Sequence, residues 1–264
     1  MLRAADVWFA YDKAPVLRAI ALTIPPAGIL GILGPNGSGK TTLLRVLAGT
    51  RTPQRGTVTL DGEPLSTFSR AELARRMAVV PQETHLAFDY TVAEVTMMGR
   101  YPHLGAFEIE GPADLAVIEE TLASTGTLHL KDRLFATLSG GEKQRVVIAA
   151  ALAQVAGGGG ALLLDEPTAS LDLGYQLEVA ALLKALQEKR GVSIVISTHD
   201  LGLAGSLCDR LVMIREGEIV ANGETGSVLT AENVRSVFGV EAEVIHRPSG
   251  QRIVVPIRPA VERP

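Results

Sequence analysis

The glycine-rich stretch GPNGSGKTT at residues 34–42 constrains this chain more than any other feature. It lies between a short apolar run and a segment with helical spacing, so it predicts a strand, a tight loop and a helix in that order. Glycines let successive backbone N–H groups converge on phosphate oxygens, and the helix N-terminus adds its dipole. The stretch therefore predicts an α/β nucleotide-binding fold, with these contact residues: Gly34, Pro35, Asn36, Gly37, Ser38, Gly39, Lys40, Thr41 and Thr42.

Two of these side chains have specific tasks in such a loop. The Lys40 ammonium reaches the terminal phosphates, and the Thr41 hydroxyl is a ligand for Mg²⁺. A nucleotide site of this kind also needs a carboxylate from a second strand, which ALLLDEP at residues 161–167 supplies. Asp165 is predicted to end that strand and to hold Mg²⁺ directly or through water. Glu166 follows on the other face of the strand end and is predicted to act on the water that attacks the γ-phosphate.

A second glycine motif, LSGGE at residues 138–142, opens another helix. Ser139 and Glu142 have the spacing of a capping box, which accounts for the serine and the glutamate. It does not account for Gly140 and Gly141, because glycines weaken a first helical turn. Paired glycines are expected where a bulky anion approaches the backbone. Since the chain's own phosphate loop already holds one nucleotide, this anion is predicted to belong to another.

In this order, the motifs resemble those of the ATP-binding subunits of ABC transporters, and the resemblance covers nearly the whole chain. It implies a head-to-tail homodimer in which each LSGGE signature closes over the ATP held by the partner's phosphate loop. It also implies that Tyr11 stacks on adenine, that Gln82 links Mg²⁺ and the attacking water to the membrane partner, and that His199 contacts the γ-phosphate. Many family members have Gln where this chain has Glu142. The residues implied to act on the partner's ATP are Ser139, Gly140, Gly141, Glu142 and Asp172.

The resemblance also implies two further functional sets. The catalytic residues are Glu166, His199, Gln82 and Lys40, and the Mg²⁺ ligands are Thr41, Gln82 and Asp165. The implied fold is an α/β P-loop NTPase core of the ABC ATPase type, with an N-terminal antiparallel β subdomain and a helical insertion subdomain. In a single domain over 1–264, the core and β subdomain occupy 1–83 and 156–239, the helical subdomain 84–155, and a hairpin-like tail 240–264.

The apolar run from Val146 to Leu164 could be mistaken for a membrane span, because Gln154 is its only strongly polar side chain. The four glycines at 157–160 break this run. They favour a short buried helix followed by a strand.

The segment TVAEVTMMGRYPHLG at residues 91–105 resembles the importer ATPases that work with iron-siderophore, haem and cobalamin permeases, as does the hairpin-like tail. Arg100, Tyr101 and His103 are therefore predicted to contact a permease. The alternative is that they only terminate a helix, since Gly99 and Pro102 are stop signals. An exporter ATPase shares the same ATP chemistry, and a soluble ABC-type ATPase of translation, DNA repair or cofactor assembly is a further alternative. A P-loop kinase or GTPase has no use for LSGGE.

Composition limits the partners. The formal charge is −4 and the basic residues are dispersed, which argues against nucleic acid. Cys208 is the only cysteine, so no disulfide framework is expected. The N-terminal residues contain no apolar core of signal-peptide length. The expected partners are ATP with Mg²⁺, a second copy of the chain, a permease and, indirectly, a substrate-binding protein, at the cytoplasmic face of the inner membrane. The sequence does not indicate which metal chelate is transported.

Overall fold

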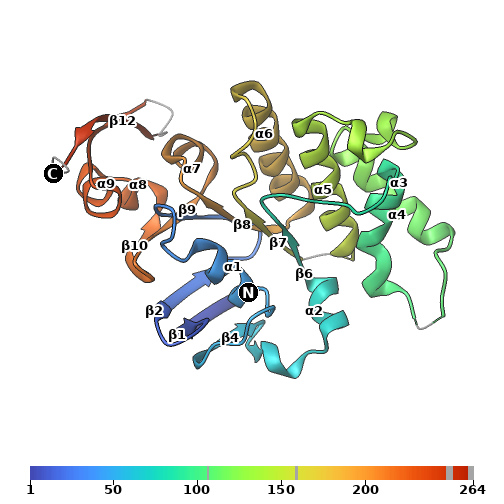
Figure 1. Cartoon of the computed structure of the whole chain (residues 1–264), viewed down its shortest axis with the longest axis horizontal. Helices are drawn as coiled ribbons and strands as arrows, with labels where there is room; N and C mark the ends of the chain where they lie inside the picture. The colour runs from blue at the N-terminus through green and yellow to red at the C-terminus, as the bar shows by residue number, and fades with distance from the viewer. Residues whose placement is uncertain (106, 158–159, 248–251, 261–264) are drawn as a thin grey trace. The chain divides into compact units, whose positions relative to one another are not determined.

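The computed structural model describes residues 1–105, 107–157, 160–247 and 252–260. The chain forms two compact units, drawn in Figure 1, and each is described by itself. The first unit combines Met1–Thr67 with Val195–Pro264, and the second is Phe68–Ile194. The predicted helical insertion over 84–155 lies within the second unit.

The first unit begins with a four-stranded antiparallel sheet of order β2-β1-β4-β5. Strand β1 (Leu2–Ala10) pairs with β2 (Pro15–Ile24) on one side and with β4 (Arg55–Leu60) on the other, and β4 turns back into β5 (Glu63–Pro64). Alternate side chains of β1 are buried, which is the pattern of a strand with one covered face. The N-terminal antiparallel β subdomain is therefore confirmed.

The same unit contains the strand that leads into the phosphate loop. Strand β3 (Ile29–Leu33) is buried at every residue and pairs in parallel with β9 (Arg210–Arg215). Strand β9 continues into an antiparallel hairpin with β10 (Glu218–Glu224). A fully apolar strand of this kind is typical of a parallel sheet covered on both faces.

Helices and a terminal hairpin complete the first unit. The predicted C-terminal hairpin is present, with β11 (Val240–His246) antiparallel to β12 (Arg252–Pro259); its predicted turn at PSG lies outside the described residues. Helix α7 was not predicted, because its sequence LGLAGSL is short and contains two poor helix formers. The helices are α1 (Lys40–Leu47), α7 (Leu201–Leu207), α8 (Thr225–Val228) and α9 (Ala231–Phe238).

The second unit pairs two parallel strands with a group of helices. Strand β6 (Met77–Val80) lies parallel to β7 (Ala161–Asp165), and the boundary between the units falls within β8 (Ser193–Thr198). One apolar cluster, which includes Val92, Leu122 and Val146, holds the helical part together. The helices are α2 (Arg70–Arg76), α3 (Val92–Met97), α4 (Pro112–Ser124), α5 (Gly140–Gln154) and α6 (Leu173–Arg190).

The long apolar run resolves as the sequence predicts. Helix α5 ends at Gln154 and β7 begins at Ala161, with the glycines between them. The Gln154 side-chain amide donates hydrogen bonds to the carbonyl oxygens of Ala74 (2.9 Å) and Met77 (3.0 Å), so it fixes the end of α5 to the α2–β6 connection. Among the described helices, none is long and apolar enough to cross a bilayer.

Candidate functional site

The phosphate loop in the first unit needs glycine because of its backbone conformation and its close contact with neighbouring backbone. A Cβ on Gly34 would lie 2.3 Å from the Ile214 carbonyl oxygen, a contact that only a costly backbone shift could relieve. Gly37 and Gly39 have φ angles of +79° and +102°, in the region that favours glycine. The loop then enters α1 directly, with Gly39 as N-cap and without a side-chain cap. The N–H groups at the start of α1 are therefore available to an anion.

The interior of this loop is polar and incompletely satisfied. The Lys40 ammonium is almost fully buried and donates hydrogen bonds to the Gly34 (3.0 Å) and Pro35 (3.2 Å) carbonyl oxygens. The Ser38 hydroxyl is buried, and within the described residues it has no hydrogen-bond partner. A buried cation beside an unsatisfied hydroxyl suits an oxyanion, so these residues fit a nucleotide phosphate.

Tyr11 lies beside the end of this loop. Its hydroxyl shares a 3.4 Å hydrogen bond with Thr42, the last residue of the motif, and this bond is the main reason that the pKa of Tyr11 is lowered. The Phe9 ring meets the Tyr11 ring edge-on, with 5.0 Å between centroids. Half of Tyr11 remains exposed. An exposed aromatic face held in place from behind is the arrangement that base stacking requires.

The acidic pair lies at the end of β7, the strand position that the sequence predicts, and belongs to the second unit. Asp165 is the last residue of β7 and is buried, whereas Glu166 is half-buried. Glu166 has a positive φ, +45°, as several other non-glycine residues of this chain do, and such a conformation costs about 1–3 kcal/mol. The backbone therefore departs from the extended strand conformation at Glu166.

The signature motif begins α5. Ser139 and Glu142 form the predicted capping box: the Glu142 N–H donates to the Ser139 hydroxyl (3.3 Å), and the Ser139 N–H donates to the Glu142 carboxylate (2.8 Å). The second bond holds the pKa of Glu142 below its usual value. A Cβ on Gly141 would lie 2.4 Å from the Tyr175 ring of α6, so this glycine is also required for packing. Exposed Gly140 has only the Leu171 side chain nearby.

The remaining predicted residues lie at the ends of elements. Asp172 is the N-cap of α6 and accepts a hydrogen bond from the Tyr175 N–H (3.1 Å). Gln82 is exposed in the segment that follows β6. His199 is exposed immediately after β8. The first unit therefore contains the phosphate loop, Tyr11 and His199, and the second contains Gln82, the acidic pair, the signature and Asp172.

The family follows from comparison with known proteins. The ABC transporter family model matches residues 17–169. The chain is 39% identical over 253 residues to the hemin import ATP-binding protein HmuV of Bordetella pertussis, an alignment that covers 94% of this chain and 95% of the relative.

This chain belongs to the ABC transporter family.

As an ABC ATP-binding subunit, it is an ATPase. It is also 37% identical over 257 residues to the ferric enterobactin transport ATP-binding protein FepC of Escherichia coli, with 97% of this chain and 94% of the relative covered. A solved metal-chelate type ABC transporter in an inward-facing conformation has a TM-score of 0.84 at 28% identity, covering 97% of this chain and 96% of that one. These likenesses confirm the predicted fold class.

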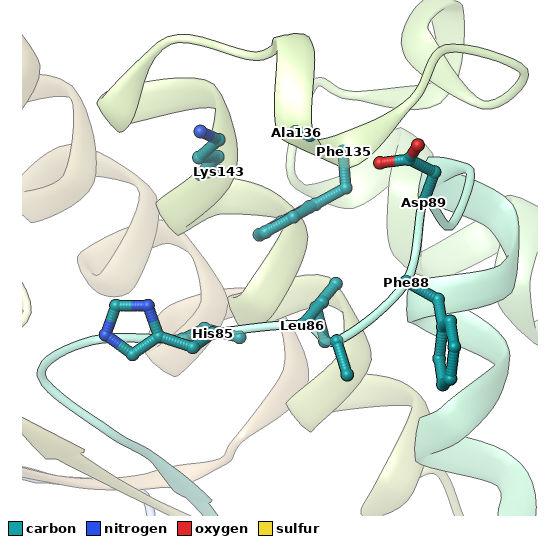
Figure 2. A pocket seen from close by; sticks show the side chains of 9 residues that line it. His85, Leu86, Phe88, Asp89, Phe135, Ala136 and Lys143 are labelled. Atoms are coloured by element: carbon teal, nitrogen blue, oxygen red, sulfur yellow. The ribbon is translucent and has the colours of Figure 1, made fainter.

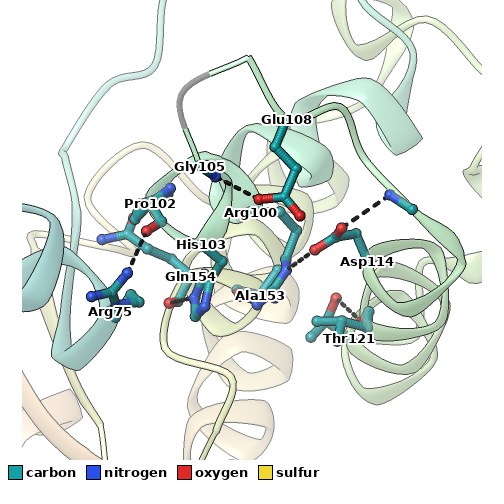
Figure 3. Close-up of polar contacts among 12 residues, drawn as sticks. Arg75, Arg100, Pro102, His103, Gly105, Glu108, Asp114, Thr121, Ala153 and Gln154 are labelled. Atoms are coloured by element: carbon teal, nitrogen blue, oxygen red, sulfur yellow. Dashed lines mark hydrogen bonds and ion pairs between the residues drawn. The ribbon is translucent and has the colours of Figure 1, made fainter.

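The GRYPH segment of this ABC subunit, residues 99–103, is held by hydrogen bonds to other residues of the second unit (Figure 3). It forms a 3₁₀ helix, η2 (Met98–His103), directly after the end of α3. The Arg100 guanidinium donates to the Asp114 carboxylate (2.9 Å) and to the Ala153 carbonyl (2.8 Å). Both charged side chains are nearly buried, and this bond from Arg100 is the main cause that lowers the pKa of Asp114.

Of the residues next to Arg100, Gly99 and His103 lie against α5, whereas Tyr101 is exposed. The His103 ring hydrogen-bonds the Gln154 carbonyl oxygen at 2.7 Å. A Cβ on Gly99 would lie 2.1 Å from the Ala150 carbonyl oxygen, so glycine lets η2 lie directly on α5. Tyr101 alone of the three predicted permease contacts is largely exposed, at 59%. Sequence spacing could not reveal the Arg100–Asp114 pair, because Asp114 reads as an ordinary first-turn acid of α4.

A groove that the sequence did not predict follows Gln82 (Figure 2). It has a volume of about 440 Å³ and is formed by residues 84–89 together with Phe135, Ala136 and Lys143. Phe88 is 73% exposed, and the Lys143 ammonium lies 6.0 Å from the centre of the Phe135 ring. The only sequence signal for this groove is the run of apolar and aromatic residues LAF, which follows no helical or strand period.

Proposed function

We propose that this chain is the ATPase subunit of an importer that takes up a metal chelate, haem or an iron-siderophore, through a separate membrane permease. The observation that carries this proposal is full-length similarity to a hemin import subunit and to a ferric enterobactin transport subunit. The alignments cover 94% and 97% of the chain and therefore extend beyond the ATP-binding motifs. Cobalamin remains within the same substrate class.

The tasks proposed for the ATP-binding residues follow the family resemblance, and local geometry supports those of Lys40 and Ser38. Lys40 exchanges its contacts with the Gly34 and Pro35 carbonyls for phosphate oxygens, and the Ser38 hydroxyl gains the partner it lacks within the described residues. Thr41, Asp165 and Gln82 hold Mg²⁺, which supplies positive charge to the phosphates.

Glu166 is the proposed general base, a role supported by its place directly after Asp165 at the end of β7. His199 contacts the γ-phosphate. These roles rest on the family resemblance.

The subunit acts as a homodimer in which the signature of one copy closes over the other copy's ATP. A dimeric bacterial ABC transporter cassette has a TM-score of 0.73 at 27% identity, which supports the dimer. Exposed Gly140 at the N-terminus of α5 is the position where an anion can approach the backbone.

Mixing two variants tests the shared sites. Lys40→Ala subunits and Ser139→Arg subunits each have two damaged sites as homodimers, whereas their heterodimer has one intact composite site. We expect ATP-driven dimerisation to return on mixing, measured by gel filtration with ATP and Mg²⁺. A mixture that stays monomeric contradicts sharing between copies.

The permease is proposed to dock in the groove of Figure 2. An exposed aromatic ring, half-buried Leu86 and the charged Lys143 and Asp89 suit a helix end with an apolar side chain and a polar rim. Because the groove follows Gln82 directly, a docked helix can influence the Mg²⁺ ligand. Tyr101 is the second proposed contact, while Arg100 and His103 hold the segment in place.

Docking is tested with variants that leave the interior intact. Phe88→Ala and Tyr101→Ala should preserve the ATPase activity of the isolated subunit while reducing co-purification with the permease encoded beside it. Arg100→Ala is the contrasting variant, because it leaves Asp114 buried without its partner and should lower thermal stability. Unchanged co-purification of both aromatic variants would overturn this docking site.

Transport itself is measured in proteoliposomes that contain the permease and the subunit. We expect ATP-dependent uptake of haem or a ferric siderophore, with Glu166→Gln as the control that binds ATP without turnover. Movement of the substrate only in the opposite direction would establish an exporter instead.

A further inference from the structure

A second open pocket lies in the first unit, on the antiparallel β subdomain and the start of β9. It has a volume of about 500 Å³, and no residue of the phosphate loop lines it. Its polar side chains are Arg3, Thr23, Asp6, Arg210 and Asn222. Arg3 and Thr23 stand directly opposite each other in the β1–β2 pairing, and Arg210 is the first residue of β9. A pocket of this size accommodates a small metabolite.

A backbone irregularity shapes this pocket. The β1–β2 register shifts between Ala4 and Val7, and Asp6 has a φ of +48° at that point. Such a bulge bends the strand and redirects side chains, and bulges often occur next to binding sites. The strand on this side of the pocket is therefore shaped by a local departure from regular pairing.

The charge of the pocket is positive and unbalanced. Within the described ranges, neither Arg3 nor Arg210 forms an ion pair. The one acid that lines the pocket, Asp6, is already paired with Arg55 at 2.9 Å. It also accepts a hydrogen bond from the Trp8 indole at 3.0 Å.

The acids next to Arg210 do not neutralise it either. Asp209 precedes Arg210 and accepts a hydrogen bond from the Ile29 N–H at 2.9 Å. Glu224 is opposite Arg210 in the β9–β10 register, but the two form no ion pair among the described contacts. The pocket is therefore lined by two arginines that form no ion pair among the described contacts.

We propose that this pocket is a binding site for a small phosphorylated anion, distinct from the ATP site. Guanidinium groups match phosphate oxygens with paired donors, and Asn222 and Thr23 supply an amide and a hydroxyl as further donors. This recognition differs in kind from the phosphate loop, which binds through backbone N–H groups and a lysine. It depends on side chains alone, so substitution can remove it without changing the ATP site.

The chain contains its own reporter for this site. Trp8 is the only tryptophan, and its indole is bonded to Asp6 in the pocket wall. The probes are inorganic phosphate and glycerol 3-phosphate, titrated against Trp8 fluorescence in the full chain. Saturating Mg²⁺–ADP fills the phosphate loop beforehand, so that a further change in fluorescence reports the second site. Vesicles containing phosphatidic acid test the same phosphate group in a lipid.

We expect saturable fluorescence changes with glycerol 3-phosphate, weakened about tenfold or more by Arg3→Gln or Arg210→Gln, since each removes a charge-assisted hydrogen bond. Arg70→Gln, an exposed arginine in the other unit, is the matched control and should leave the titration unchanged. Thermal melts should show that all three variants fold. An identical titration in the Arg3→Gln/Arg210→Gln double variant, or a response to vesicles only, would overturn the proposal.

Discussion

The two glycine motifs of this chain use glycine for different physical reasons. In the phosphate loop, Gly34 is required because the Ile214 carbonyl oxygen occupies the space of a Cβ, and Gly37 because φ is positive. In the signature, Gly141 is required because the Tyr175 ring lies against it, while Gly140 has space around it. A glycine pair within one motif can therefore combine a packing glycine with one that leaves the backbone open to a ligand.

The largest effect is expected at the residue that acts after both motifs have closed on ATP. Glu166→Gln should keep ATP binding and lower turnover by about 10²–10⁴-fold, because an amide cannot accept the proton of the attacking water. The variant should also accumulate as an ATP-bound dimer in gel filtration. Hydrolysis near the unsubstituted rate would contradict the general-base role of Glu166.

A single methyl group added at Gly34 should disrupt the phosphate loop. Gly34→Ala should weaken ATP binding by roughly 10²–10³-fold, which corresponds to about 3–4 kcal/mol, since the loop must move away from Ile214. Isothermal titration with ATP measures this loss. The matched control is Gly62→Ala, which has a φ of +92° but nothing within 4 Å of its Cβ. Gly62→Ala should lose a little stability and no ATP affinity.

The signature responds differently to the same change. Gly141→Ala should lower the free energy of unfolding by about 1–3 kcal/mol, because its Cβ overlaps the Tyr175 ring. Combining it with Tyr175→Ala removes that overlap. The double variant should therefore lose less stability than the sum of the losses in the two single variants. Gly140→Ala should fold normally and lose ATP-driven dimerisation instead. Equal stability losses at Gly140 and Gly141 would remove the distinction between them.

The sequence could predict what is local along the chain. The capping box of Ser139 and Glu142, the strand ending at Asp165 and the C-cap at Gly191 each depend on residues a few positions apart, and all three are present. The packing role of Gly141 was not predictable, because Tyr175 comes from another helix.

The importer segment shows the same limit. Its resemblance to importer ATPases predicts one outward role for Arg100, Tyr101 and His103, but Asp114 and the end of α5 hold the first and the last. Contacts between elements that are distant in sequence leave no local pattern. The groove after Gln82 escaped prediction for the same reason, since two of its walls come from residues 84–89 and from Phe135 to Lys143.

The smallest effect concerns the charge in the signature's capping box. The Ser139 N–H bond lowers the pKa of Glu142 in the folded state, so the ionised carboxylate stabilises the fold at pH values above the unfolded pKa. This contribution is lost as the pH falls through the lowered, folded pKa. Glu142 is partly exposed, and caps contribute about 1 kcal/mol, so the effect should not exceed that.

Glu142→Gln keeps an acceptor for the Ser139 N–H and removes the titration. Thermal melts between about pH 6 and pH 3 should therefore show a shallower acid loss of stability for Glu142→Gln than for the unsubstituted chain. Glu72→Gln, in the equivalent capping box of α2, is the matched control. The pKa of Glu72 is lowered by the same kind of bond from the Ser69 N–H. Glu72→Gln should therefore also reduce the loss of stability at low pH, but without affecting dimerisation. If Glu142→Gln instead loses stability more steeply as the pH falls, the carboxylate does not stabilise the signature helix. The serine and glutamate of the motif would then need an explanation other than capping.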